Sequence, residues 1–372
     1  MPYSRNYFMY MLYAVLAAYT AYTYLWSRFG LGVTAALQYV LLCLVLLGLC
    51  KYFFAPSSAK NTFVNWLIVL WISQLLGFYL GNSAYTTQLK ECTFVLLIAA
   101  PFISMRYNPK HNKYIMIALS VISVAMFFVS MSLMYLENEN AYGGGYYSLV
   151  ALPILLYFTR NKSLKVQVIC SGVIVILVLM SVKRGDILSC FLSIIVYFAV
   201  FQRLKKFDFR LLLAFIFLVF IGYFAYDYLL HNSPLFASRI RETLEGNSSG
   251  RDIIYDSLWH YFLNAPFDVQ LFGGGFDASV QIAGNRAHSD WLEVLTCEGI
   301  IGVILYFGAF LSLFIQIRKC ANISDKAVLS AILTIWFVKS MFSMFIFSQP
   351  SILLFALTGY ILNKQIDRQY EY

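Results

Sequence analysis

The stretch AHSDWLEVLTCEGIIGVILYFGAFLSLFIQI, residues 287–317, joins a polar segment to a long apolar run. The apolar part, from Trp291 to Ile317, is longer than the roughly 20 residues that a helix needs to cross a bilayer. His288, Asp290 and Glu293 stand at its entrance. The stretch therefore predicts a transmembrane helix that begins beside side chains able to carry chemistry.

The rest of the chain repeats the apolar part of this pattern. Hydrophobic residues make up 60% of the 372 residues and charged residues 12%, and the mean hydropathy is +0.71. No soluble fold can bury that much apolar surface. We therefore predict an all-α integral membrane protein with about twelve transmembrane helices. The predicted spans are residues 7–26, 31–54, 63–80, 92–105, 114–136, 146–158, 166–182, 187–201, 211–230, 291–317, 327–347 and 352–362.

Basic residues predict the orientation, because they gather on the cytoplasmic loops of membrane proteins. If the N-terminus is cytoplasmic, the inside segments hold 18 of the 27 basic residues, and both termini lie inside. The chain then divides into helices one to nine (1–230), a large catalytic loop on the outer side with an interfacial helix (231–290), and helices ten to twelve with a cytoplasmic tail (291–372). The net charge of +9 follows from this topology, and its scatter over many short loops argues against nucleic acid as a partner.

Cysteine and carboxylate spacing gives no sign of a metal or other cofactor. The seven cysteines lie in or beside apolar spans, without a CxxC pair or clustered histidines. This pattern is typical of small buried hydrophobes rather than of a disulfide framework. No group of carboxylates offers the ligands of a hard cation, so we expect metal-independent chemistry.

A helix is predicted inside the large loop, starting near Arg251. Ser249 can cap it, with Asp252 as a weak capping-box acid, and apolar residues recur at helical spacing until Pro266 ends the run. Arg251 and the free backbone N–H groups of the first turn can together face an anion. The alternative is an interfacial helix whose arginine contacts only lipid phosphate.

Three consecutive glycines follow in the same loop. Gly273, Gly274 and Gly275 let the backbone turn tightly and approach a ligand, so we place them among the candidate substrate-binding residues. The alternative is a flexible turn, since a second triple glycine at residues 143–145 has no reactive neighbours.

His288 is the candidate proton acceptor of the loop, because a neutral imidazole takes up a proton near neutral pH. Asp290 and Glu293 follow within about one helical turn, where they can orient the imidazole or bind sugar hydroxyls. The alternatives are a capping histidine and two first-turn acids favoured by the helix dipole.

The short segment Ser181–Asp186 places Lys183 and Arg184 on the predicted outer side, against the orientation rule. A lipid diphosphate fits Arg184, because a guanidinium binds phosphate oxygens bidentately. The alternative partner of Arg184 is Asp186.

Lys339 lies inside the eleventh predicted span, eight residues or about 12 Å from Phe347. A charge within the membrane marks a functional site, and the alternative is a lysine that snorkels to the surface. Lys183, Arg286 and Lys339 complete the predicted substrate-binding set.

The order of these motifs resembles the O-antigen ligase and polymerase superfamily. The resemblance runs from about Met180 to Phe347. It is carried by Ser181-x-x-Arg184-Gly185, Ser249-Gly250-Arg251, Leu271–Gly275, Ala287–Glu293 and Glu298-Gly299-Ile300-Ile301-Gly302.

Members of that superfamily are multi-spanning glycosyltransferases of the bacterial inner membrane that use undecaprenyl-diphosphate-linked glycans. The resemblance therefore implies such a donor, a glycan or lipid A-core acceptor, and an active site that faces the periplasm. It also implies that Arg184 and Arg251 bind the diphosphate and that His288 is the catalytic histidine of the loop. Ser289-Asp290 departs from the ligases, which more often have asparagine after the histidine, and this favours a polymerase.

The residue types fit that chemistry. A sugar linked to diphosphate is already activated, so the enzyme has to stabilise the departing anion and prepare an acceptor hydroxyl. Arg184 and Arg251 suit the first task and His288 the second. A lipid or polysaccharide transporter is the competing class, but transporters place polar groups near the midplane and often show internal repeats. Here the polar residues are concentrated in the predicted outer loop.

Overall fold

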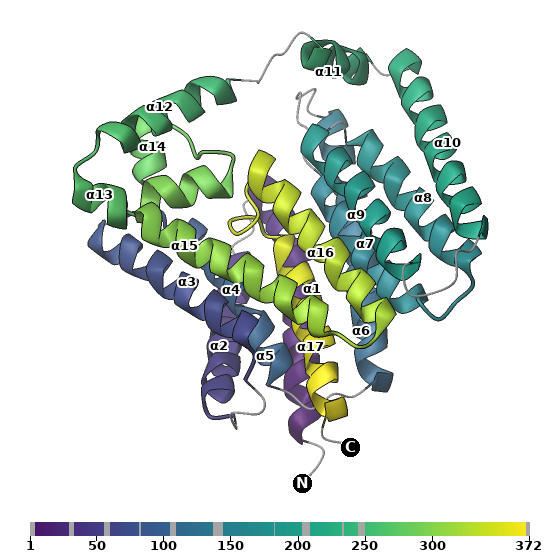
Figure 1. Ribbon diagram of the computed structural model, residues 1–372, viewed down its shortest axis with the longest axis horizontal. Helices are drawn as coiled ribbons and strands as arrows, with labels where there is room; N and C mark the ends of the chain where they lie inside the picture. The colour runs from purple at the N-terminus through teal and green to yellow at the C-terminus, as the bar shows by residue number, and fades with distance from the viewer. Residues whose placement is uncertain are drawn as a thin grey trace.

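The computed structural model of the chain is built from helices (Figure 1). It describes residues 4–29, 33–55, 60–81, 83–104, 109–136, 144–181, 183–202, 209–232, 234–244 and 250–369, which contain no strand. The helices are α1 (Ser4–Phe29), α2 (Val33–Phe53), α3 (Thr62–Leu80), α4 (Thr86–Leu97), α5 (Ala99–Ile103), α6 (Pro109–Leu136), α7 (Gly145–Thr159), α8 (Leu164–Met180), α9 (Arg184–Gln202), α10 (Phe209–Asn232), α11 (Pro234–Leu244), α12 (Arg251–Asn264), α13 (Phe267–Phe272), α14 (Ala278–Ala283), α15 (Asp290–Lys319), α16 (Ile323–Phe342) and α17 (Ser351–Gln369).

Several helices have the composition of membrane spans, as predicted. A helix satisfies its own backbone hydrogen bonds, which lipid cannot do. Five segments of the described chain are long and apolar enough to cross a membrane: Ala36–Phe53, Thr62–Leu80, Thr86–Ile103, Arg184–Phe201 and Asp290–Lys319. Shorter apolar helices cover Tyr7–Ala21, Met116–Val129, Gly145–Thr159, Leu164–Met180 and Ser351–Asn363. The all-α class is confirmed and the five candidate spans support a membrane protein, whereas twelve crossings stay a prediction.

Two predicted spans differ from their expected form. The fourth is divided between α4 and α5 next to Pro101, which has no N–H for a helical hydrogen bond to Leu97. The eleventh ends at Phe342 rather than Phe347. Beyond it, the N–H groups of Phe345 and Ile346 bond to the carboxylate of Asp290 at 2.9 and 3.3 Å, so they are not available for further helix.

The predicted tenth span is bent sharply. Gly299 interrupts α15 with φ 68° and ψ −161°, a conformation that only glycine adopts readily. As a result Asp290 accepts a hydrogen bond of 2.7 Å from the hydroxyl of Tyr306. In a straight helix these residues would lie about 24 Å apart along the axis. Only the part after Gly299 therefore runs as one long segment, of about 30 Å.

Aromatic side chains fill the space between α15, α16 and their neighbours. The indole of Trp336 stacks on Phe310 with ring centroids 3.8 Å apart and also packs against Phe355. Its N–H donates a hydrogen bond of 2.9 Å to Tyr306. In a membrane such close packing, rather than exclusion of water, holds helices together.

The polar segment lies at one end of the molecule. Figure 1 shows α11 to α14 along the upper edge, whereas the start of α1 and the end of α17 lie at the lower edge. The predicted sidedness, with both termini on one side and residues 231–290 on the other, is compatible with this arrangement. Its orientation in a membrane stays a prediction.

Candidate active site

The last turn of α16 is where segments carrying the predicted catalytic residues meet. The guanidinium of Arg251 donates a hydrogen bond of 2.8 Å to the carbonyl of Phe342. The start of α9 adjoins the same turn, because the backbone of Gly185 lies close to Phe342. If Gly185 carried a Cβ, that atom would be 3.7 Å from the Cβ of Phe342. The hydroxyl of Ser289 donates to the carbonyl of Ser340 at 3.2 Å. The segments that bear Arg184, Arg251 and His288 therefore converge.

Arg251 is the first residue of α12, at the N-terminal end of the helix, where the helix dipole is positive. Its N-cap is Gly250, with φ 78°, which has no side chain with which to cap the helix. The first N–H groups of a helix carry partial positive charge and can face an anion. The helix ends at Asn264, just before Pro266, as predicted. Ser249, the predicted cap, lies outside the described residues.

His288 has an unusual backbone and a cationic environment. Its φ of 52° is positive, which among the described residues occurs at no other non-glycine position. The ring is half-buried. Burial lowers the pKa of His288 below its ordinary value, and the positive charges of Arg251 and Lys183 lower it further, against an opposing effect of Glu293. The imidazole is therefore neutral at neutral pH and able to accept a proton.

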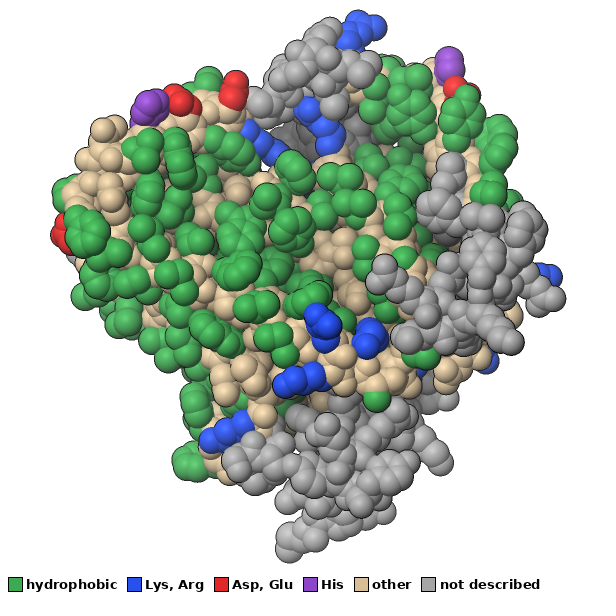
Figure 2. Space-filling model, in the orientation of Figure 1, with side chains coloured by type: hydrophobic (Ala, Val, Ile, Leu, Met, Phe, Trp, Pro, Cys, Tyr) green, Lys and Arg blue, Asp and Glu red, His purple; other side chains and the backbone are tan. Residues whose placement is uncertain are grey.

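A hollow opens at the upper edge of the molecule. Figure 2 shows Lys and Arg side chains beside it, between the start of α12 and the α9–α10 side. Directly below the hollow, the surface in the same view is largely apolar over α15 and α16, down to a group of Lys and Arg side chains. The anionic headgroup of a lipid at the hollow would therefore contact cations, while the apolar tail of the same lipid would contact apolar helices.

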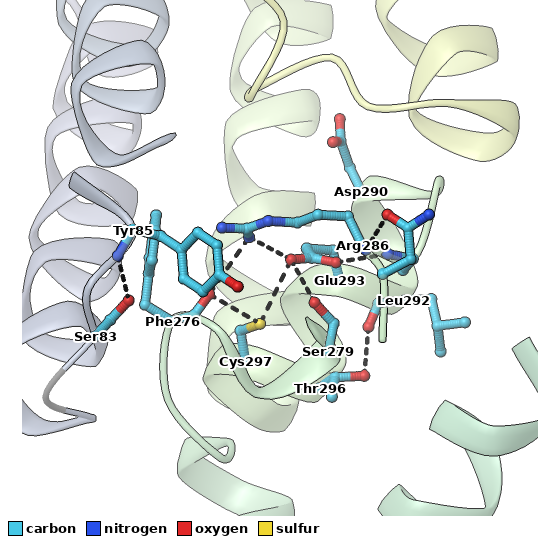
Figure 3. A network of polar contacts seen from close by, with 12 residues as sticks. Ser83, Tyr85, Phe276, Ser279, Arg286, Asp290, Leu292, Glu293, Thr296 and Cys297 are labelled. Carbon is cyan, nitrogen blue, oxygen red and sulfur yellow. Dashed lines mark hydrogen bonds and ion pairs between the residues drawn. The ribbon is translucent and has the colours of Figure 1, made fainter. Parts of the chain in front are cut away.

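Arg286 and Glu293 pair with each other (Figure 3). The carboxylate of Glu293, only 1% exposed, also accepts hydrogen bonds from Ser279 at 2.8 Å and from the backbone of Ala287 at 2.9 Å. The guanidinium of Arg286 lies over the ring of Phe347, 4.9 Å from its centroid. The pair holds the loop that precedes His288, and the Nη2 atom of Arg286 has no hydrogen-bond partner among the described residues. The contact of Arg286 with substrate stays a prediction, whereas the carboxylate of Glu293 is occupied by the protein.

Asp290 is turned away from that pair, and its side chain is fully buried (Figure 3). Its oxygens accept hydrogen bonds from Tyr306, Phe345 and Ile346. The carboxylate thus joins the start of α15 to the loop after α16, and the predicted contact of Asp290 with sugar hydroxyls does not fit.

The triple glycine contacts protein backbone. The bend at Gly299 leaves carbonyls of the preceding turn without helical partners, and Gly274 and Gly275 donate to Thr296 and Cys297 at 2.9 and 3.1 Å. A Cβ at Gly273 would lie 2.2 Å from the backbone of Cys297. The backbone of these glycines does approach another group closely, as predicted. That group is the backbone of α15 rather than the predicted ligand.

Lys339 and Asp186 form a buried ion pair at 2.5 Å between α16 and α9. The ammonium also lies 4.0 Å from the centroid of the Tyr146 ring. Lys339 is 1% exposed, so neither the snorkelling interpretation nor a direct contact with substrate fits. Asp186 was the predicted alternative partner of Arg184, but it pairs with Lys339 instead.

Sequence reasoning missed the carbonyl of Phe342 and the hydroxyl of Tyr255, which donates a 3.2 Å hydrogen bond to the carbonyl of His288. A backbone carbonyl carries no residue signature, so no pattern identifies Phe342. Tyr255 follows Arg251 by one helical turn, and that spacing was the available signal.

Fold and site together define an all-α membrane protein with cations and one imidazole gathered at one end. In a comparison with known families, residues 169–307 match the family described as O-antigen ligase. The match contains Arg184, Arg251 and His288, and it confirms the predicted resemblance to the O-antigen ligase and polymerase superfamily. It supports an O-antigen ligase or polymerase type of function. No curated protein matches the chain.

Proposed function

We propose that the protein is a bacterial inner-membrane glycosyltransferase that polymerises undecaprenyl-diphosphate-linked repeat units at the periplasmic face. The observation that carries this proposal is the convergence of the Lys183–Arg184 segment, Arg251 and a neutral His288 on the last turn of α16. Two kinds of group are needed for transfer from a diphosphate, and this arrangement supplies both.

The cations act on the leaving group. As the bond between the anomeric carbon and the diphosphate oxygen breaks, negative charge grows on the diphosphate. Arg184 and Arg251 stabilise that charge with positions set before the reaction begins, so that little reorganisation is needed. Arg251 is already fixed by its bond to Phe342, and its remaining N–H groups can point to phosphate oxygens.

His288 acts on the acceptor. A hydroxyl of the acceptor glycan attacks the anomeric carbon, and the imidazole takes the proton of that hydroxyl. The products are the lengthened glycan, undecaprenyl diphosphate and a protonated His288 that later releases its proton to water. General-base assistance of this kind contributes about 10²–10⁴-fold in rate.

The closest competing function is that of an O-antigen ligase, which uses the same donor but transfers the glycan to lipid A-core. Ser289-Asp290 after the histidine favours the polymerase. Gel profiles of a deletion strain separate the two. Loss of a polymerase leaves surface glycans of a single repeat unit, whereas loss of a ligase leaves long chains on undecaprenyl diphosphate and a bare core. Long lipid-linked chains after deletion would contradict the polymerase.

A further inference from the structure

An apolar groove of about 340 Å³ lies between the second part of α15 and α16. Phe307, Leu311 and Phe314 line one side, and Leu333, Thr334 and Phe337 the other. The single hydroxyl among these six side chains bonds to its own helix, from Thr334 to the carbonyl of Ser330 at 2.9 Å. The lining therefore offers no unsatisfied polar atom and suits a hydrocarbon ligand.

The groove leads towards the candidate active site. Phe337 precedes Phe342 by five residues, which is about 7.5 Å along the helix axis. Between them Met341 is 43% exposed and Phe342 itself 49%, so an apolar strip continues up to the carbonyl that holds Arg251. Figure 1 shows α15 and α16 side by side at the front of the view, where no other helix covers them.

The cations of the site and the apolar groove below them are complementary to one kind of molecule, an amphiphile with an anionic head and a long hydrocarbon tail. We propose that the groove binds the polyisoprenoid tail of the glycan donor, in the part nearest to its diphosphate. This inference rests on the proposed function. It assigns to α15 and α16 a share of donor affinity that is independent of the glycan.

The physical basis is the contact of the tail with aromatic rings. The rings of Phe310 and Phe337, from α15 and α16, both line the groove, and their centroids lie 6.2 Å apart. In lipid there is no hydrophobic gain from leaving water, so binding depends on close packing. Larger side chains in the groove should therefore displace the tail.

The test compares two donors with the same diphosphate-linked glycan, one on undecaprenol and one on a short chain of two isoprene units. The full chain, purified and reconstituted in phospholipid vesicles, is assayed as wild type, Leu333→Trp and Thr334→Trp. The matched control is Ile169→Trp on α8, at a side chain that is 62% exposed. We expect each groove variant to raise KM for the long-chain donor by about tenfold, equivalent to about 1.4 kcal/mol, with kcat unchanged. KM for the short-chain donor, and all constants of the control, should not change.

Other outcomes overturn the proposal. Equal effects on both donors would show that the tryptophans disturb the site itself. Unchanged constants for both donors would show that the tail lies elsewhere. If, in addition, less phospholipid copurifies with the groove variants than with wild type, the groove binds a bulk lipid chain instead of the donor. A changed oligomeric mass with unchanged KM would make the groove a contact between copies. A wild type inactive with both donors, yet correctly folded, would overturn the proposed function and this assignment with it.

Discussion

The cations around His288 have two consequences for the same side chain. Arg251 and Lys183 disfavour a second positive charge, so they keep the imidazole neutral while they remain available to an anion. A bound diphosphate would offset part of their charge. The proposed division of work, with cations for the leaving group and an imidazole for the proton, is thus electrostatically consistent.

A pH profile tests the role of His288. Because its pKa lies below the ordinary value of about 6.5, kcat should be constant at neutral pH and fall as the pH drops through that lowered pKa. Arg251→Ala removes one positive neighbour, so in this variant the residual activity should begin to fall at a higher pH. His288→Ala should lower kcat and leave donor binding close to normal. Normal kcat in His288→Ala, or loss of donor binding alone, would contradict proton transfer.

Alanine variants of Arg184 and Arg251 test the binding of the leaving group. Each should lose charge-assisted hydrogen bonds of about 1.5–3 kcal/mol, measured as lower kcat/KM. Lysine should restore little at either position, because it lacks the planar fork. The matched control is Arg241→Ala, at an exposed arginine of α11. Wild-type activity of well-folded Arg184→Ala and Arg251→Ala would reduce both to lipid anchors.

At the scale of elements, the bend of α15 depends on glycine at two facing positions. A Cβ at Gly299 would lie 2.5 Å from the backbone of Leu271, and a Cβ at Gly273 would collide with Cys297. The bend and the glycine turn therefore form one unit, which brings Asp290 to the loop after α16 and sets the loop of His288.

Gly299→Ala should sharply lower the yield and thermal stability of the protein, because it adds a steric clash to a conformational cost of about 1–3 kcal/mol. Gly284→Ala is the matched control: its φ is also positive, at 70°, but a Cβ there meets nothing within 4 Å. It should cost only about 1–2 kcal/mol. Equal melting temperatures for the two variants in detergent would argue against this account of the bend.

One buried ion pair joins α9 to α16. Lys339→Met leaves Asp186 buried without its partner, and Asp186→Asn does the same to Lys339, so each should cost about 3–5 kcal/mol. The double variant removes both charges and should recover most of that loss. Melting temperatures of the four proteins form the measurement. A double variant as unstable as the single ones would show that the pair does not act as a unit.

At the scale of the whole molecule, the polar helices and the two termini lie at opposite ends (Figure 1). Single cysteines at Asp256 on α12 and at Lys162 between α7 and α8, both exposed, test the orientation in a background without the seven native cysteines. An impermeant thiol reagent added outside cells should label the cysteine at Asp256 and not the one at Lys162. Labelling in the reverse pattern would invert the topology.

The sequence by itself determined the class of the protein and the residues from which a site could be built. Apolar runs long enough for a bilayer appear in a single sequence, because their cause is composition. Arg184, Arg251 and His288 could be selected for the same reason: their side chains are chemically unusual beside apolar spans. The helix from Arg251 to Asn264 followed from local spacing and Pro266.

Only the tertiary structure decided what these residues contact. In the sequence, a charged residue or a glycine near a loop has the same pattern whether its partner is a ligand or the protein itself. This holds for Arg286, Asp290, Glu293, Lys339 and the triple glycine. The partners of Lys339 and Asp290 lie far away in sequence: Asp186 is 153 residues from Lys339, and Phe345 is 55 from Asp290. Such pairings arise from the bend of α15 and from the packing of α9 on α16, and they depend on backbone geometry that local spacing does not contain.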